Sequence, residues 1–97
     1  MLLNSAYKER EKAYLEIMDY LTYILEITNP FDLMWLTSYE LPTFILNRVK
    51  RIYYLTDSET DLVLNHIIQW CTMVGYYNDD KYTKLFFDYN LKELMHI

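Results

Sequence analysis

Ser58-Glu-Thr-Asp-Leu-Val-Leu-Asn-His-Ile-Ile-Gln-Trp-Cys-Thr-Met-Val-Gly75 is the stretch around which the fold of this chain is expected to form. On a helix that turns by about 100° per residue, apolar side chains cover most of its circumference. One line consists of Val63, Ile67, Trp70 and Val74, and further apolar residues lie on both of its flanks. A helix that is apolar nearly all round is typical of a buried position. We therefore expect Leu62–Val74 to be the central buried helix.

Length and composition predict the fold class of the remainder. A chain of 97 residues fits one domain and can bury a modest core without metal or disulfide bonds. The hydrophobic fraction of 53% excludes a disordered chain. One Gly and two Pro are few for the many turns of an all-β domain. We expect an all-α fold, a compact bundle of four to five helices, in which residues 1–97 form a single helical domain.

Start and stop signals predict where the helices begin and end. The first helix is expected over residues 5–28, and a short second one over 30–36. A third helix is expected to begin between Ser38 and Pro42, because proline is tolerated in a first turn, and to run to about residue 55. The first helix has an apolar arc wider than usual, so it is either clasped by several neighbours or meets a second copy in a homodimer.

The second half of the chain carries further signals. Ser58 and Asp61 resemble a capping box, and Gly75 is expected to end the central helix with a positive φ. A last long helix is expected over residues 80–89, with a break at Asn90. Its inward face is predicted from four apolar side chains: Tyr82, Leu85, Phe86 and Tyr89.

No catalytic or metal-binding constellation is recognisable in the sequence. The single Cys71 excludes an internal disulfide and is expected to pack as a small hydrophobic residue. The two histidines and this cysteine have no spacing that resembles a zinc site. We therefore expect no enzyme activity, no catalytic residues, no metal and no cofactor. A signal peptide and a membrane span are not expected either, which favours a cytoplasmic location.

The charge distribution suggests a first candidate surface. The net charge of −5 opposes a general affinity for nucleic acid, yet residues 41–55 carry basic residues and no acidic one. We predict a basic and aromatic surface on this helix, formed by Phe44, Asn47, Arg48, Lys50, Arg51 and Tyr54. Residues 31–55 also resemble a helix-turn-helix motif, which implies a DNA-binding transcription regulator as the alternative.

The eleven tyrosines suggest protein binding, because tyrosine is enriched at protein interfaces. A second candidate surface is acidic and aromatic, and comprises Asp57, Glu59, Tyr76, Tyr77, Asp79 and Asp80. The abundance of residues with AT-rich codons is typical of many phages, viruses and plasmids, and of many cellular genomes. We expect a small acidic regulator or inhibitor that binds a host nucleic-acid-handling protein in the host cytoplasm. A structural or assembly component is the further alternative.

Overall fold

Four α-helices make up almost all of the chain that the structure describes. The computed structural model describes the backbone of residues 2–27, 30–77 and 79–97, and the side chains of residues 7–26, 40–74 and 79–97. Within these ranges there is no strand, and the helices are α1 (Leu2–Ile27), α2 (Pro30–Ile52), α3 (Asp57–Tyr77) and α4 (Asp80–Met95). The predicted all-α bundle of four to five helices is confirmed.

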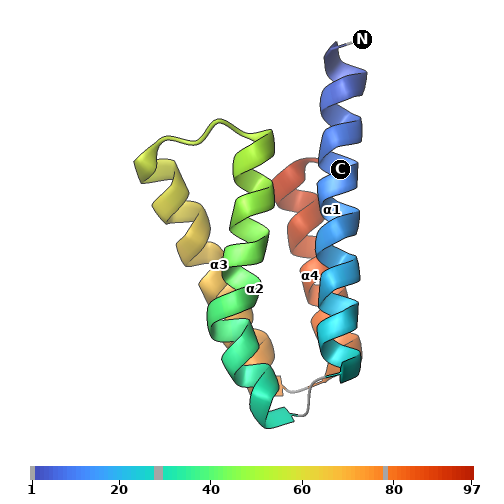
Figure 1. Ribbon diagram of the computed structural model, residues 1–97, viewed down its shortest axis with the longest axis vertical. Coiled ribbons are helices and arrows are strands. Elements are labelled where there is room, and N and C mark those ends of the chain that lie inside the picture. The colour runs from blue at the N-terminus through green and yellow to red at the C-terminus, as the bar shows by residue number, and fades with distance from the viewer. Residues whose placement is uncertain (1, 28–29, 78) are drawn as a thin grey trace.

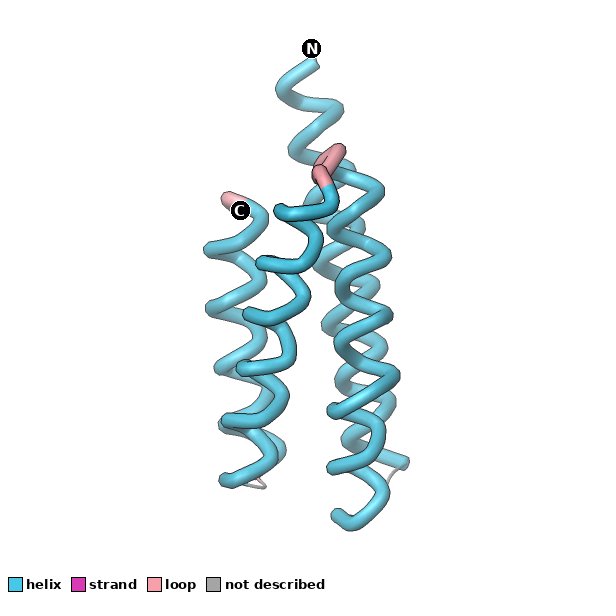
Figure 2. The backbone as a smooth tube through the Cα atoms, turned by 90° about the vertical axis from the view of Figure 1, so that its left-hand side faces the viewer, coloured by secondary structure: helices cyan, strands magenta, loops and turns pink. Residues whose placement is uncertain are grey.

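The helices alternate in direction and form a ring (Figure 1). α1 packs against α2 and α4, whereas α3 packs mainly against α2 and makes fewer contacts with α4. Both ends of the chain lie toward the same end of the bundle as the loop between α2 and α3. The first turns of α1 project beyond the other helices in both views (Figures 1 and 2). The seam between α3 and α4 is therefore the least closed part of the ring.

The apolar stripe of α1 supplies the largest share of the described core. Ala13, Ile17, Leu21 and Ile24 are buried, as their spacing predicts, and Leu25 joins them. They recur every three or four residues and so occupy one face of the helix. α2 adds Leu41, Ile45 and Val49 to the same core. The wide arc of α1 is thus covered, at least over residues 13–25, by neighbours within this chain.

α2 is one continuous helix from Pro30 to Ile52, with Pro42 inside it. The prediction of two helices separated by a turn is therefore wrong. Pro42 has no N–H to donate to the carbonyl of residue 38, and its ring crowds that turn. The side chain of Pro42 is buried in the bundle, beside the buried Leu41. Packing of this segment evidently offsets the local cost of the proline.

α3 is not the central buried helix that its sequence predicts. Ile67, Cys71 and Val74 are buried, and Val63 and Trp70 are partly buried, so the predicted line does face the core. The flanks of that line are exposed: Leu62 by 61%, Met73 by 45% and Ile68 by 41%. The inference failed because, among the described residues, α3 packs mainly against α2 and less extensively against α4, which leaves part of its surface uncovered.

The boundaries of α3 also differ from the prediction. The capping box is formed by Thr56 and Glu59: the Glu59 N–H donates to Thr56 Oγ1 at 3.2 Å, and the Thr56 N–H donates to Glu59 Oε1 at 3.0 Å. Hydrogen bonds to the Glu59 carboxylate, first from the Thr56 backbone N–H and second from the Thr56 side chain, lower the pKa of Glu59. Gly75 lies within α3, which continues to Tyr77, so the predicted stop at Gly75 is wrong.

α4 continues through Asn90 to Met95 and buries a face other than the one predicted. Its buried residues recur at intervals of four: Thr83, Phe87, Leu91 and Met95. Leu85 and Tyr89, which were expected to point inward, are exposed by 63% and 65%. Two apolar stripes compete on this helix, and the second one ends in the charged Glu93. The stripe without a charged residue over all four turns is the one that is buried.

Both ends of α4 are capped. Asp79 Oδ1 accepts from the Tyr82 N–H at 3.0 Å and caps the first turn. At the other end His96 adopts the left-handed conformation with φ 57°, and the Ile97 N–H donates to the Lys92 carbonyl at 3.0 Å. The Tyr53 hydroxyl donates to the Met95 carbonyl at 3.1 Å, which connects the end of α2 to the end of α4.

Replacing Pro42 by Ala tests the continuity of α2. Alanine restores the missing donor and removes the clash of the ring, and proline costs about 3 kcal/mol relative to alanine inside a helix. Replacing proline also gives the unfolded chain more conformational freedom, which lowers the free energy of unfolding by about 0.4–1 kcal/mol. Removing the buried ring also loses packing in the bundle, so we expect Pro42→Ala to raise the free energy of unfolding in urea by only about 1–2 kcal/mol.

The exposed Asn47→Ala, in the same helix, is the control and should change stability by about 0.5 kcal/mol or less. A loss of stability in Pro42→Ala would contradict the continuous helix and favour a turn before residue 42.

Candidate functional site

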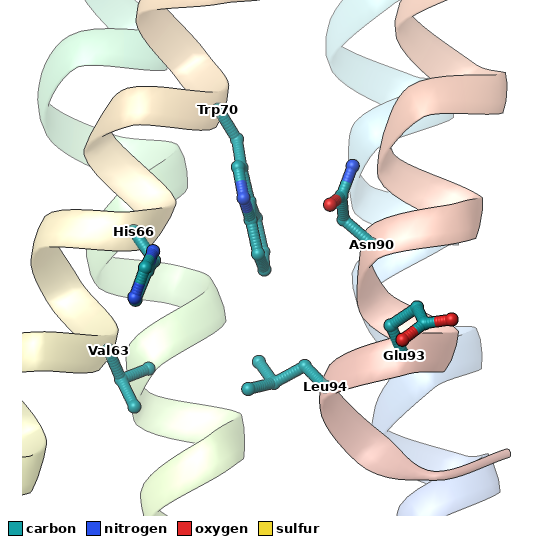
Figure 3. A pocket seen from close by; sticks show the side chains of 6 residues that line it. All are labelled: Val63, His66, Trp70, Asn90, Glu93 and Leu94. Carbon is teal, nitrogen blue, oxygen red and sulfur yellow. The ribbon is translucent and has the colours of Figure 1, made fainter.

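A groove lies along the open seam between α3 and α4 (Figure 3). Its volume is about 260 Å³, and it is lined by Val63, His66, Trp70, Asn90, Glu93 and Leu94. The Trp70 side chain extends from α3 toward α4, and Leu94 points from α4 toward Val63. The lining is mostly apolar, with polar groups supplied by one histidine, one amide and one carboxylate. Such a mixture is typical of a binding site for a mainly apolar ligand.

Helical spacing places the lining residues on facing stripes. Val63, His66 and Trp70 are three and four residues apart and share one face of α3. Below them, Trp70 contacts Phe87 of α4 edge-on, with ring centroids 6.3 Å apart. This contact joins α3 to α4 beside the groove and restricts the movement of the indole. Trp70 is therefore half-buried at the groove and does not lie in the centre of the core.

Exposed apolar side chains extend the groove along α3. Leu62 precedes His66 by four residues and Met73 follows it by seven, so all three lie on the same side of the helix. Leu62 and Met73 are exposed by 61% and 45%. On α4, Tyr89 precedes the groove-lining Glu93 by four residues and is also exposed. A groove with apolar rims on both sides presents a contiguous surface, in contrast to single exposed apolar residues, which are common.

The part of the chain that forms the groove carries most of the net negative charge. Residues 57–97 contain seven acidic and three basic residues, whereas residues 1–56 contain seven acidic and six basic residues. α3 contains no Lys or Arg. Glu93 is the charged residue in the groove lining, and the exposed Glu59 precedes Val63 by one helical turn. The field around the groove is therefore negative.

The predicted basic and aromatic surface on residues 44–54 is only partly a surface. The Arg48 guanidinium lies 3.8 Å from the centroid of the Phe44 ring, and its Nε lies 3.4 Å from Glu16 Oε2 of α1. Phe44 in turn stacks on Tyr20 of α1, with centroids 4.1 Å apart and planes at 11°. Phe44 and Arg48 thus hold α2 against α1, because flat apolar and cationic side chains stack favourably on aromatic rings.

Glu40 of α2 contacts the same Tyr20 side chain. The Tyr20 hydroxyl donates to Glu40 Oε2 at 3.4 Å. Burial, followed by the negative charge of Glu40 and the hydrogen bond to it, raises the pKa of Tyr20. The other four residues of the predicted surface remain exposed: Asn47, Lys50, Arg51 and Tyr54. Tyr54 is 99% exposed, at the loop that leads to α3.

The predicted acidic and aromatic surface is not one surface. Asp57 and Glu59 lie at the start of α3, and Asp79 and Asp80 lie at the start of α4, at the opposite end of the bundle (Figure 1). A helix of 21 residues separates them, which corresponds to about 30 Å. Glu59 and Asp79 are helix caps. The side chains of Tyr76 and Tyr77 lie outside the described residues.

The sequence does not predict the groove residues, for a different reason on each helix. α3 is less buried than predicted, and α4 buries another face and ends later than predicted. Taking Leu62–Val74 as central assigned Val63 and Trp70 to a closed core. Ending the last helix at Asn90 removed Glu93 and Leu94 from it. A usable signal was present in the competing stripe on α4, in which Phe86 and Asn90 lead to the charged Glu93. A stripe that ends in a charge is typical of a face at the edge of the core.

Cys71 is buried, and burial raises the pKa of its thiol to about 12. A thiol with so high a pKa stays protonated at neutral pH and is a poor nucleophile. Among the described residues, no group of three or more His, Cys, Asp or Glu side chains lies close enough to hold a metal ion. Over the same residues, no helix has the length and apolar character needed to cross a membrane.

Comparison of this chain with protein-family models, with curated proteins and with solved structures found no match.

Arg48 and Arg51 provide a matched test of which basic residues act within the fold. Arg48→Ala removes the contact with Phe44 and should lower the free energy of unfolding by about 1 kcal/mol. Arg51 is exposed, so Arg51→Ala should change it by about 0.5 kcal/mol or less. Urea unfolding of both variants measures the difference. Equal effects would show that Arg48 does not secure α2 to α1.

Proposed function

We propose that this protein is a non-enzymatic, acidic protein-binding regulator or inhibitor. The observation that carries this proposal is the apolar groove between α3 and α4, with exposed Leu62 and Met73 on its rim. Apolar surface left exposed beside a groove is typical of a site for another macromolecule. Its volume of about 260 Å³ is below the roughly 300–1,000 Å³ of small-molecule sites, which favours side chains of a partner as the occupant.

The charge of the protein supports a basic partner. The net charge is −5, and residues 57–97, which include the groove, carry most of the imbalance. Complementary charge steers association and selects among partners. Nucleic-acid-handling proteins present basic surfaces, which an acidic inhibitor can occupy. We propose that class of partner on the basis of charge.

DNA binding through residues 31–55 is less well supported. A helix-turn-helix motif requires a turn between its helices, whereas residues 30–52 form one helix. Of the three basic residues there, Arg48 is engaged with Phe44 and Glu16, which leaves Lys50 and Arg51 exposed.

Site-specific photo-crosslinking in the cells that produce the protein tests the proposal. A photoreactive amino acid is introduced in turn at four exposed positions: Tyr23 on α1, Tyr54 after α2, Leu62 on α3 and Tyr89 on α4. We expect a defined protein adduct at one or more positions that disappears when excess unlabelled protein is added. Partner contacts at exposed aromatic side chains give such adducts because these residues anchor interfaces.

A mobility-shift assay with random DNA duplexes is the control. Repulsion from an acidic protein should keep DNA affinity at or below non-specific levels of about 10⁻⁴ M at physiological salt. The absence of a competable adduct at all four positions would contradict the protein-binding function. A sequence-specific shift at nanomolar protein would favour the DNA-binding alternative.

A further inference from the structure

We propose that the groove between α3 and α4 binds an amphipathic helix of the partner whose apolar stripe is flanked by Lys and Arg. This inference rests on the proposed protein-binding function and assigns it a site and a ligand chemistry. The argument has three parts, which concern the shape of the groove, its central tryptophan and its charge.

The shape favours a helix as the ligand. α3 and α4 run antiparallel along the groove and expose apolar side chains between them, as a helix-binding groove does (Figures 1 and 3). Leu62 and Met73 on the rim are 11 residues apart, which corresponds to about 16 Å or three helical turns. A helix of three to four turns therefore matches the rim. Its side chains at every third or fourth position would enter the groove.

Trp70 is placed to anchor such a helix. Its indole projects between the two helices at the groove. The Phe87 ring of α4 contacts it edge-on. Tryptophan is enriched among the residues that dominate binding energy, particularly in well-packed surroundings. Because this side chain is already held by Phe87, little conformational freedom is lost when a ligand covers it.

The charge selects a basic helix in preference to a second copy of this chain. Glu93 lines the groove, and Glu59 precedes Val63 by one helical turn. α3 contains no Lys or Arg. The one basic residue of α4 close to Glu93 in sequence is Lys92, which pairs with Asp88 at 3.4 Å. A symmetric dimer through this face would bring two negative surfaces together. Lys or Arg beside the apolar stripe of a partner would instead meet Glu93 and Glu59.

Fluorescence anisotropy with a designed peptide tests the inference on the full-length protein. The probe is a labelled helical peptide with Leu at positions i, i+3, i+4 and i+7 and Lys at the flanking positions. A second peptide has Glu in place of every Lys. We expect the Lys peptide to bind with a Kd on the order of 10 µM and the Glu peptide at least about tenfold more weakly.

Two pairs of variants locate the binding site. Leu62→Lys at the rim should weaken binding of the Lys peptide about tenfold, because it removes an apolar contact and adds repulsion. Its control is Leu15→Lys, since Leu15 is also exposed, by 50%, but lies on α1, which contributes no residue to the groove lining. Glu93→Lys should weaken binding about fivefold or more, whereas Glu26→Lys on α1 should have less than about a twofold effect. Circular dichroism of each variant verifies that it is folded.

The inference is overturned by three results. These are no binding of the Lys peptide at about 1 mM, equal binding of both peptides, and equal effects of Leu62→Lys and Leu15→Lys. Light scattering that shows a dimer disrupted by Leu62→Lys would identify a second copy as the occupant and would also overturn it. If these peptide results were accompanied by crosslinking at Tyr23 or Tyr54 alone, the groove would not be the binding site. The proposed protein-binding function would still stand.

Discussion

The attachment of α1 to both of its neighbours is the constraint on which the rest of this bundle depends. Its buried stripe, Ala13 to Leu25, faces the core, and each flank carries a polar or aromatic attachment. On one flank Tyr20 stacks on the Phe44 ring, and the Arg48 guanidinium also lies over this ring. On the other flank the Tyr14 hydroxyl donates to Asp88 of α4, which also pairs with Lys92. Apolar burial supplies the stabilisation, and these contacts fix the rotation of the helix.

α1 packs against a neighbour on each side, whereas the seam between α3 and α4 is the most open one in the ring. α3 packs mainly on α2 and meets α4 through few contacts, of which the edge-on pair Trp70–Phe87 is one. The apolar residues that α3 and α4 do not bury against each other form the groove and its rim. The groove and its rim expose apolar surface to water, which is unfavourable for the isolated protein. The same surface is suited to binding a partner that covers it. The negative charge of this half then determines the kind of partner that fits.

Local signals in the sequence predicted the fold class and the face of α1, whereas nonlocal packing decided the rest. The stripe of Ala13, Ile17, Leu21 and Ile24 has polar residues opposite it, so one face was clear. α3 is apolar all round, and how much of it is buried depends on how many neighbours it has, which no local pattern reveals. α4 has two apolar stripes, and Pro42 is tolerated inside α2. Consequently the groove, which lies where both α3 and α4 were misassigned, could not be predicted.

The central claim is that α1 supplies the largest share of the described core whereas one flank of α3 faces solvent. Two matched leucine substitutions test it most directly. Leu21 of α1 is fully buried and Leu62 of α3 is 61% exposed, so the same truncation probes both positions. Measured by urea unfolding, Leu21→Ala should lower the free energy of unfolding by about 3–4 kcal/mol, through lost burial and the cavity left behind. Leu62→Ala should lower it by less than about 1 kcal/mol. Equal losses, or a larger loss for Leu62→Ala, would contradict this account and make α3 the central helix.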